Sequence, residues 1–101
     1  MARSPDVCIV GGGIVGTAIA WRLAKDGLAV TLLERGAIGR ESSWAAGGML
    51  TPVHLAEYPG PLAEICAASL ALYEPLCREL AGLSAVDPEY RTTGLLLLVT
   101  S

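Results

Sequence analysis

Three glycines near the amino terminus have the spacing that binds the phosphates of a dinucleotide. Gly11, Gly13 and Gly16 form the pattern G-x-G-x-x-G within the stretch VGGGIVG. The first glycine of this pattern permits a sharp turn, the second lets a pyrophosphate approach bare backbone, and the third lets a helix pack closely. The N–H groups near Ile14 and Val15 would face the phosphates with roughly half an elementary positive charge. The pattern therefore indicates pyrophosphate binding by backbone, without a lysine.

A carboxylate further along the chain occupies the position of the ribose ligand in the same pattern. Glu34 follows the apolar run 29–33 and lies 18 residues beyond Gly16, which is close to the ~20 residues of dinucleotide-binding units. A carboxylate there accepts hydrogen bonds from ribose hydroxyls and repels a 2′-phosphate, which disfavours NADP. For Glu34 taken alone, the alternative is a solvated charge at the end of a strand. The Walker pattern is absent from the sequence, which argues against a nucleoside triphosphatase.

These residues need a strand, a helix and a second strand to position them. Residues 7–10 are an apolar run ended by glycine, which is typical of a strand buried on both faces of a parallel sheet. Residues 14–26 have the pattern of a helix, and Gly27 is placed as the left-handed residue that follows it. Residues 29–33 contain β-branched residues and predict a second strand. The order predicts the βαβ unit of a Rossmann-like α/β fold.

The second half of the chain predicts a long helix and the start of a sheet strand. Apolar residues recur at helical spacing over 61–80, where an apolar stripe usually indicates core packing. Gly82 is positioned to end this helix, and Pro75 is expected to kink or divide it. The dipeptide Asp87-Pro88 predicts a turn, and the apolar run 95–99 predicts a strand.

Composition excludes several classes of protein. The chain has 101 residues, is 52% hydrophobic and carries a net charge of -3, so it offers no basic stripe for nucleic acid. Its longest aliphatic run is far shorter than the ~20 residues of a membrane span, and no signal peptide is indicated. Three cysteines without a CxxC pair favour reduced, buried thiols in a cytoplasmic protein. The lone His54 lacks partner ligands, so we expect no metal site.

The segment after the second strand bears on the choice between FAD and NAD. Residues 34–52 are rich in Gly, Ser and Ala, where an NAD-binding domain would run into its next helix. Such small residues let a cofactor lie against the main chain, with N–H groups and hydroxyls as donors. The alternative is a flexible surface loop, since glycine and serine are common in turns.

Two stretches of the chain resemble a known family. The segments VCIVGGGIVGTAIAWRLAKDGLAVTLLERG and SSWAAGGMLTP are similar to the amino-terminal region of the FAD-dependent D-amino-acid oxidase superfamily, with the closest likeness to the glycine oxidases of thiamine biosynthesis. The likeness extends through AASLALYEPLCRELAGLSAVDPEYRTTGLLLLV and so covers essentially the whole chain. The stretch that begins Ser-Ser and continues Ala-Ala-Gly-Gly-Met-Leu is more specific than the glycine triplet.

The resemblance implies roles for the matching residues of this chain. The residues implied to bind FAD are Gly11, Gly13, Ile14, Val15, Gly16, Glu34, Arg35, Ser42, Ser43, Ala46, Gly47, Gly48 and Met49. The first five would hold the pyrophosphate, Glu34 would bind the adenosine ribose, and Arg35 would lie by the adenine end. The two serines would meet the pyrophosphate or ribityl side, and the stretch 47–49 would line the flavin ring.

The activity implied by the resemblance is oxidative deamination of glycine or a related small amino acid. A hydride passes from the α-carbon to flavin N5, oxygen reoxidises the flavin, and water hydrolyses the imine to a 2-oxo acid and ammonia, with hydrogen peroxide as the other product. Sarcosine, D-amino acids and proline-like amines remain alternative substrates, and an oxidase is not distinguished from a dehydrogenase. In the family, an arginine and a tyrosine beyond residue 101 hold the substrate carboxylate. Tyr90 and Arg91 do not match them, so we expect no catalytic residue here.

We expect residues 1–101 to be the amino-terminal portion of an FAD-binding domain, with the substrate domain mostly absent. The full-length protein could form a homo-oligomer, and no membrane partner is evident. Two alternatives remain open at this point. The chain could be a non-catalytic dinucleotide-binding module, or part of an NAD-dependent dehydrogenase whose loop imitates the flavin segment.

Overall fold

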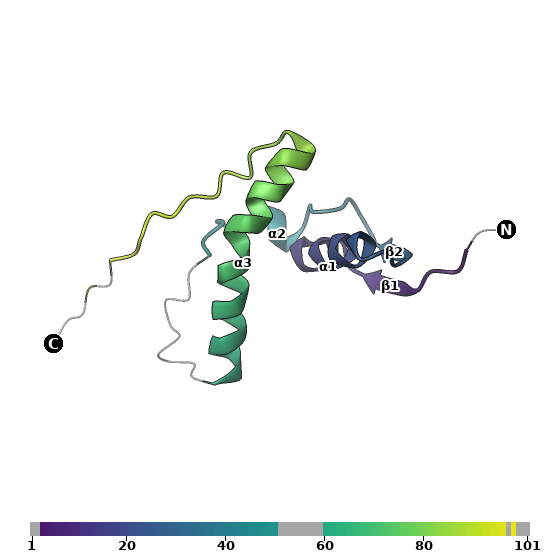
Figure 1. Ribbon diagram of the computed structural model, residues 1–101, viewed down its shortest axis with the longest axis horizontal. Coiled ribbons are helices and arrows are strands. Elements are labelled where there is room, and N and C mark those ends of the chain that lie inside the picture. The colour runs from purple at the N-terminus through teal and green to yellow at the C-terminus, as the bar shows by residue number, and fades with distance from the viewer. Residues whose placement is uncertain (1–2, 51–59, 97, 99–101) are drawn as a thin grey trace. The chain divides into compact units, whose positions relative to one another are not determined.

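The computed structural model describes residues 3–50, 60–96 and 98. The chain divides into two units, residues 1–49 and 50–101. In chain order the elements are β1 (Val7–Val10), α1 (Ile14–Lys25), β2 (Val30–Leu33), α2 (Ser42–Ala45) and α3 (Pro61–Ser84) (Figure 1). The first unit thus contains the predicted βαβ order, and the second contains the predicted long helix.

The strands β1 and β2 form a parallel pair. Val7 lies opposite Val30 and Val10 lies opposite Leu33, with no slip between them. The pairing continues past the end of the strands, where the N–H of Gly11 donates to the carbonyl of Leu33 over 2.8 Å. Two apolar runs joined by a helix can pair in this way because the helix returns the chain to the start of the sheet. This is the start of a Rossmann-like α/β fold, as the sequence predicts.

Helix α1 ends as its sequence predicts. Gly27 has a φ of +90°, which a residue with a side chain rarely adopts. Its N–H donates to the carbonyl of Ala24 over 3.0 Å, and the N–H of Leu28 donates to that of Leu23 over 3.1 Å. These two bonds are the Schellman motif, which satisfies the last carbonyls of a helix. The motif turns the chain directly into β2.

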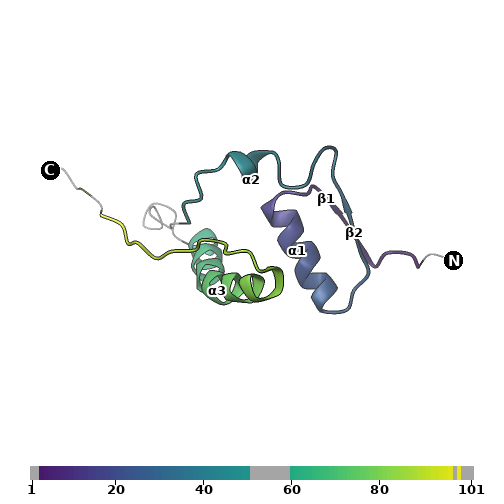
Figure 2. The ribbon, with the colours of Figure 1, turned by 90° about the horizontal axis from the view of Figure 1, so that it is seen from above.

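Only one face of the strand pair is covered. Half-buried and exposed residues alternate along both strands, with Val7 and Ile9 half-buried and Val10 85% exposed. Helix α1 lies along one side of the pair (Figure 2), and Ile9 faces it, since a methyl carbon of Ile9 lies 3.5 Å from a Cβ built on Gly16. The prediction of a strand buried on both faces is therefore wrong for the described residues. One helix can cover only one face of a sheet.

The open face also changes the expected environment of the cysteines. Cys8 points to the uncovered side of β1 and is exposed, while Cys66 and Cys77 are half-buried. All three are free thiols, as the sequence predicts, but the expectation that they are buried is wrong. In the case of Cys8 the reason is the alternation of side chains along a strand, which sends every second residue to the open face.

Helix α3 is longer than predicted and is not divided. It begins with a proline at its first turn and contains Pro75 without interruption, so the expected division is wrong. A proline removes one hydrogen bond of the helix ladder, which a helix of 24 residues survives. Gly82 lies inside the helix instead of ending it. The end comes at Ser84, after which Ala85 adopts the left-handed conformation with φ 56° and its N–H bonds to Ala81.

The segment after α3 contains the predicted turn but not the predicted strand. The carboxylate of Asp87 accepts a hydrogen bond from the N–H of Glu89 over 2.8 Å, which is the Asx-turn typical of Asp-Pro sequences. Of the run 95–99, the described residues 95, 96 and 98 are not in a strand. A strand needs a neighbour for its backbone hydrogen bonds, and the described part of this unit holds no second strand. His54 lies outside the described residues.

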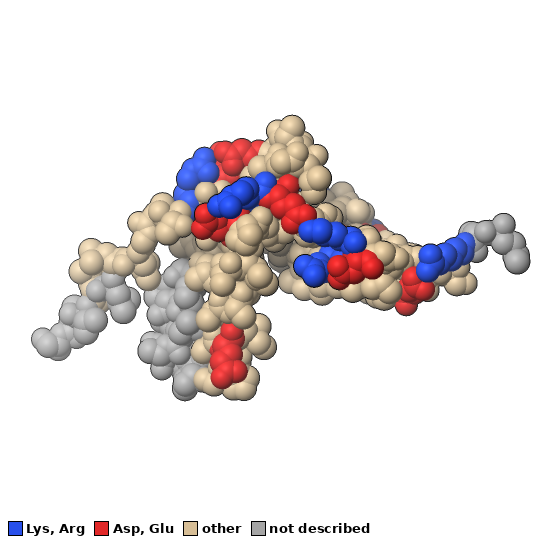
Figure 3. Space-filling model, viewed as in Figure 1, with Lys and Arg blue, Asp and Glu red and all other residues tan. Residues whose placement is uncertain are grey.

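Charged side chains pair locally over the surface. Arg3 pairs with Asp6, and Arg22 pairs with Asp26 one helical turn away. On the face shown in Figure 3, acidic and basic side chains accordingly lie next to one another. The described residues also contain no helix long and apolar enough to cross a membrane.

Candidate functional site

Gly11 and Gly13 of the G-x-G-x-x-G pattern lie in the turn between β1 and α1, and Gly16 lies in the first turn of α1. Geometry requires glycine at two of these positions. Gly11 has a φ of +106°, which only glycine adopts without strain. A Cβ built on Gly16 would collide with the carbonyl oxygen of Gly11, so a side chain at Gly16 would push α1 away from the turn. The first glycine therefore makes the turn and the third permits close packing of the helix, as the pattern predicts.

The middle glycine of the pattern faces a serine from the loop. Gly13 precedes the first turn of α1, and a Cβ built on it would lie 3.2 Å from Oγ of Ser43. The N–H of Ile14 donates to the same Oγ over 2.9 Å. Ser43 therefore caps α1 from 29 residues further along the chain. The first turn of α1 contains no acidic side chain, so α1 itself supplies no negative charge against the partial positive charge of its amino terminus.

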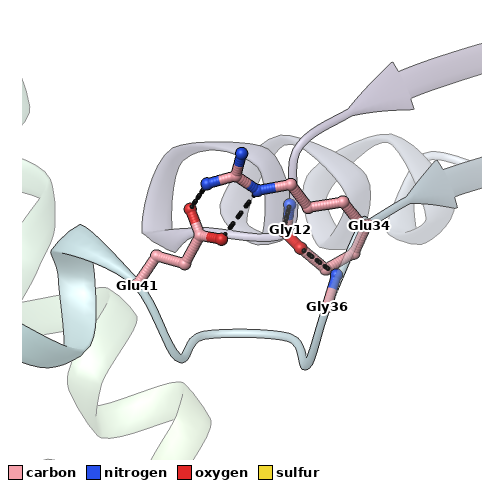
Figure 4. A network of polar contacts seen from close by, with 5 residues as sticks. Gly12, Glu34, Gly36 and Glu41 are labelled. Atoms are coloured by element: carbon pink, nitrogen blue, oxygen red, sulfur yellow. Dashed lines mark hydrogen bonds and ion pairs between the residues drawn. The ribbon is translucent and has the colours of Figure 1, made fainter.

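Glu34 holds the glycine turn from the end of β2. Its Oε1 accepts a hydrogen bond from the N–H of Gly12 over 3.3 Å, and its Oε2 accepts one from the N–H of Gly36 over 3.0 Å (Figure 4). Each carboxylate oxygen has further acceptor capacity. The Glu34 side chain is thus fixed beside the glycine turn while its oxygens retain the capacity to accept further hydrogen bonds.

Arg35 and Glu41 form a two-point ion pair in the loop after β2. Nε and Nη2 of Arg35 each lie 2.8 Å from a different carboxylate oxygen of Glu41. The hydrogen bond and then the charge of Glu41 raise the pKa of Arg35, and those of Arg35 lower the pKa of Glu41. Both side chains are exposed, so the pair itself contributes little to the free energy of unfolding.

The remaining predicted residues follow in and after the short helix α2. Ser42 begins α2 and is exposed. After α2 the backbone of Ala46 is extended, Gly48 has a φ of +78°, and the side chain of Met49 is 85% exposed. The structure therefore brings the glycine turn, Glu34 and Ser43 together. Residues 46–49 follow α2 in the sequence and are exposed.

Two contributors to this arrangement were not among the predicted site residues. Gly12 donates to Glu34 and accepts a 2.8 Å hydrogen bond from the N–H of Gly39. Glu41 holds Arg35. The sequence signal for Gly12 is its place in the middle of the triple glycine. In the structure, a Cβ at this position would lie 3.3 Å from the Glu34 side chain. Arg35 and Glu41 are six residues apart in a loop, and no sequence pattern predicts that two such residues form an ion pair.

Tyr90 and Arg91 have structural partners in the second unit. The rings of Tyr73 and Tyr90 stack with centroids 6.2 Å apart, and Arg91 pairs with Asp87 over 3.2 Å. The described residues contain no cluster of His, Cys, Asp and Glu that could hold a metal ion.

Comparison with known proteins decides the family. Residues 6–101 match the family described as FAD dependent oxidoreductase, abbreviated DAO. The chain belongs to this family. The cofactor of the family is FAD, so the alternative of an NAD-dependent dehydrogenase is wrong. The geometry agrees with this family, because the glycine turn, the amino terminus of α1 and Glu34 fit the adenosine diphosphate half of a dinucleotide.

Individual members of the FAD-dependent oxidoreductase family are similar to this chain over a limited part of their length. The glycine oxidase of Pseudomonas aeruginosa is 40% identical over 92 residues, which are 91% of this chain and 25% of that protein. The glycine oxidase of Bacillus subtilis is 36% identical over 101 residues, 100% of this chain and 27% of that protein. The D-amino acid dehydrogenase of Paramagnetospirillum magneticum is 47% identical over 57 residues, 54% of this chain and 13% of that protein. The chain spans about a quarter of the length of these glycine oxidases.

Proposed function

We propose that this chain is the amino-terminal portion of the FAD-binding domain of an amino-acid oxidoreductase that acts on glycine or a related small amino acid. The observation that carries the proposal is the amino terminus of α1, where the N–H of Ile14 and the hydroxyl of Ser43 meet 2.9 Å apart beside Gly13. A helix terminus with a bare glycine and a hydroxyl fits a pyrophosphate. The similarity to glycine oxidases supports the choice of substrate.

In this proposal the first unit binds and orients the cofactor. Gly11, Gly13, Ile14, Val15 and Gly16 hold the pyrophosphate together with the hydroxyls of Ser42 and Ser43. Glu34 accepts hydrogen bonds from the adenosine ribose, since its carboxylate is already held beside the turn by Gly12 and Gly36. Arg35 lies by the adenine end, and Ala46, Gly47, Gly48 and Met49 line the flavin ring.

The chemistry of the reaction divides between cofactor and protein. When bound, FAD supplies the electron sink that accepts a hydride from the substrate α-carbon. This chain fixes the position of the cofactor through backbone donors that cannot move independently of α1. Binding of the substrate carboxylate is assigned to residues outside this chain.

The test is a titration of the purified chain with FAD, followed by quenching of flavin fluorescence, with NAD as competitor. Saturable binding that excess NAD does not displace is the expected result. Displacement by equimolar NAD, or no quenching with a chain that is folded by circular dichroism, would contradict the cofactor assignment.

A second candidate for the reaction is amino-acid dehydrogenation without peroxide. It is favoured by the 47% identity to a D-amino acid dehydrogenase over 57 residues, which are 54% of this chain. The two are separated by adding glycine, sarcosine and D-alanine to a flavin-loaded longer form of the protein. Peroxide formation with glycine is expected, whereas reduction of a dye with D-alanine and no peroxide would favour the dehydrogenase.

A further inference from the structure

The loop between β2 and α2 is closed by contacts that converge on the start of α2. The N–H of Gly36 is held by Glu34, and the N–H of Gly39 is held by the carbonyl of Gly12 over 2.8 Å. The ion pair of Arg35 and Glu41 then joins the two ends of the loop at two points of 2.8 Å each. A loop rich in glycine has high conformational entropy when it is not tied in this way.

Glu41 has two functions at the start of α2. Its backbone carbonyl accepts hydrogen bonds from the N–H groups of Trp44 and Ala45, over 3.0 and 3.1 Å. Its side chain is held by Arg35. The ion pair therefore fixes the position at which α2 begins, and Ser43 is the residue of α2 that reaches Ile14. A shift of this start by one residue would remove the Ser43 hydroxyl from α1.

The ion pair with Glu41 also keeps the charge of Arg35 away from Glu34, the residue proposed to bind the ribose. Glu34 attracts the Arg35 guanidinium, but Nε and Nη2 of Arg35 donate their hydrogen bonds to Glu41. The oxygens of Glu34 remain on the N–H groups of Gly12 and Gly36 (Figure 4). Besides Glu41, Glu34 is the acidic residue whose charge raises the pKa of Arg35.

We propose that Arg35 and Glu41 are a positioning pair, which places Ser43 on the N–H of Ile14 and leaves Glu34 on the glycine turn before the cofactor binds. This inference rests on the proposed function for its consequence, which is a higher affinity for FAD. The positions of Ser43 and Glu34 that the pair sets can be measured on the chain without cofactor. An exposed ion pair contributes little to folding, so a positioning role and a merely structural role make different predictions.

The test compares Glu41→Gln, which removes the charge at nearly constant size, with Glu41→Asp, which retains it. Glu74→Gln is the matched control, because it breaks the exposed pair with Arg78 in the second unit. The first readout is hydrogen exchange of the Ile14 amide, measured by NMR without cofactor. The second is fluorescence of Trp44 in a Trp21→Phe background, and the third is the Kd for FAD.

In Glu41→Gln we expect faster exchange at Ile14, altered Trp44 fluorescence and a two- to about fivefold higher Kd for FAD, the range of an exposed pair. Glu41→Asp restores most of each effect, and Glu74→Gln leaves all three readouts at their original values. Unchanged Ile14 exchange in Glu41→Gln would overturn the inference whether or not the chain binds FAD. Faster exchange with an unchanged Kd would overturn its consequence for the cofactor. Absence of FAD binding by the unaltered chain would instead contradict the proposed function, while Ile14 exchange would still decide the role of the pair.

Discussion

The two units of the chain differ in the sequence separation of the contacts that hold them. In the first unit, hydrogen bonds join Ile14 to Ser43 and Gly12 to Glu34, which are 29 and 22 positions apart. These bonds come from the start of one helix, the end of one strand and a loop, and they meet at one turn. A binding site requires such convergence, because its donors must come from different elements.

The second unit is held mostly by contacts along one helix. Its ion pair between Arg78 and Glu74 and its hydrogen bond between Ser84 and Leu80 each span four residues, and the stacking of Tyr73 on Tyr90 is longer in range. The apolar positions of α3 are largely uncovered, with Ile65 66% exposed. Local contacts make a helix without specifying a site, so the first unit is where single substitutions should have large and specific effects.

The largest effect is expected at Gly16. Gly16→Ala would place a Cβ against the carbonyl oxygen of Gly11, and backbone cannot move away as a flexible side chain could. We expect the free energy of unfolding of the first unit to fall by about 1–3 kcal/mol. The measurement is urea unfolding followed by the amide signals of β1 and β2.

The counterpart of this substitution in the second unit is Gly82→Ala. A Cβ on Gly82 meets no atom within 4 Å, and the residue is helical. It should stabilise α3 by about 0.5–1 kcal/mol, the difference between the two residues in a helix. Equal effects of the two substitutions would contradict the distinction between the units.

The second largest effect is expected at Gly13, where it falls more on binding than on folding. Its backbone has φ -80° and ψ -169°, which valine also adopts, so Gly13→Val should leave the βαβ unit folded. The side chain would displace Ser43 and occupy the space of the pyrophosphate, and loss of a hydrogen bond to a charged group corresponds to about tenfold or more in Kd. Flavin titration measures this. Gly36→Ala is the control, since a Cβ there meets nothing within 4 Å, and an unchanged affinity of Gly13→Val would refute the placement of the phosphates.

A smaller effect is expected at Ser43. Ser43→Ala removes the acceptor of the Ile14 N–H, and loss of a helix cap costs about 1 kcal/mol. We expect this loss in the unfolding of the first unit, with the strongest change in hydrogen exchange at Ile14. The control is Ser42→Ala, which alters the neighbouring exposed serine of α2. It should change the free energy of unfolding by no more than about a few tenths of a kcal/mol. Similar losses for both serines would show that the cap does not stabilise α1.

The smallest effect is the dependence on acid. The hydrogen bond and charge of Arg35 lower the pKa of Glu41, so its stabilising contribution is fully present above the unfolded value of about 4.3 and is lost as the pH falls through the lower folded value. Carboxyl NMR titration should therefore place the pKa of Glu41 below the value that the same residue has in the unfolded chain. Asp87 serves as the reference in the second unit, because its pKa is lowered by the N–H of Glu89 and then by Arg91 and should not respond to Glu41→Gln. Titration of Glu41 at or above the unfolded value would contradict the ion pair.

The sequence predicts the first unit well because its signals are local. Glycine spacing, apolar runs and the left-handed Gly27 each act within a few residues, and together they predict β1, α1 and β2. The contacts of Ser43 with Ile14 and of Arg35 with Glu41 depend on the course of a loop, which no periodicity encodes. The resemblance to a family supplied Ser43 as a site residue, but the helix cap that it forms came only from the structure.

In the second unit, the sequence predicts the helix and misplaces its end. Gly82 is a common stop signal, yet α3 continues to Ser84, where the hydroxyl of Ser84 bonds to Leu80 and Ala85 turns left-handed. The apolar run 95–99 has the composition of a strand, but composition does not provide the neighbouring strand that its backbone needs.

The most direct test of the account is an amide NMR titration of the chain with FAD. The account predicts saturable shifts at Ile14, Val15 and Gly16, with the amides of α3 in the second unit as an internal reference that does not move, and no such shifts with NAD at the same concentration. Shifts confined to α3, or equal responses to NAD, would contradict the claim that the amino terminus of α1 holds the pyrophosphate of FAD.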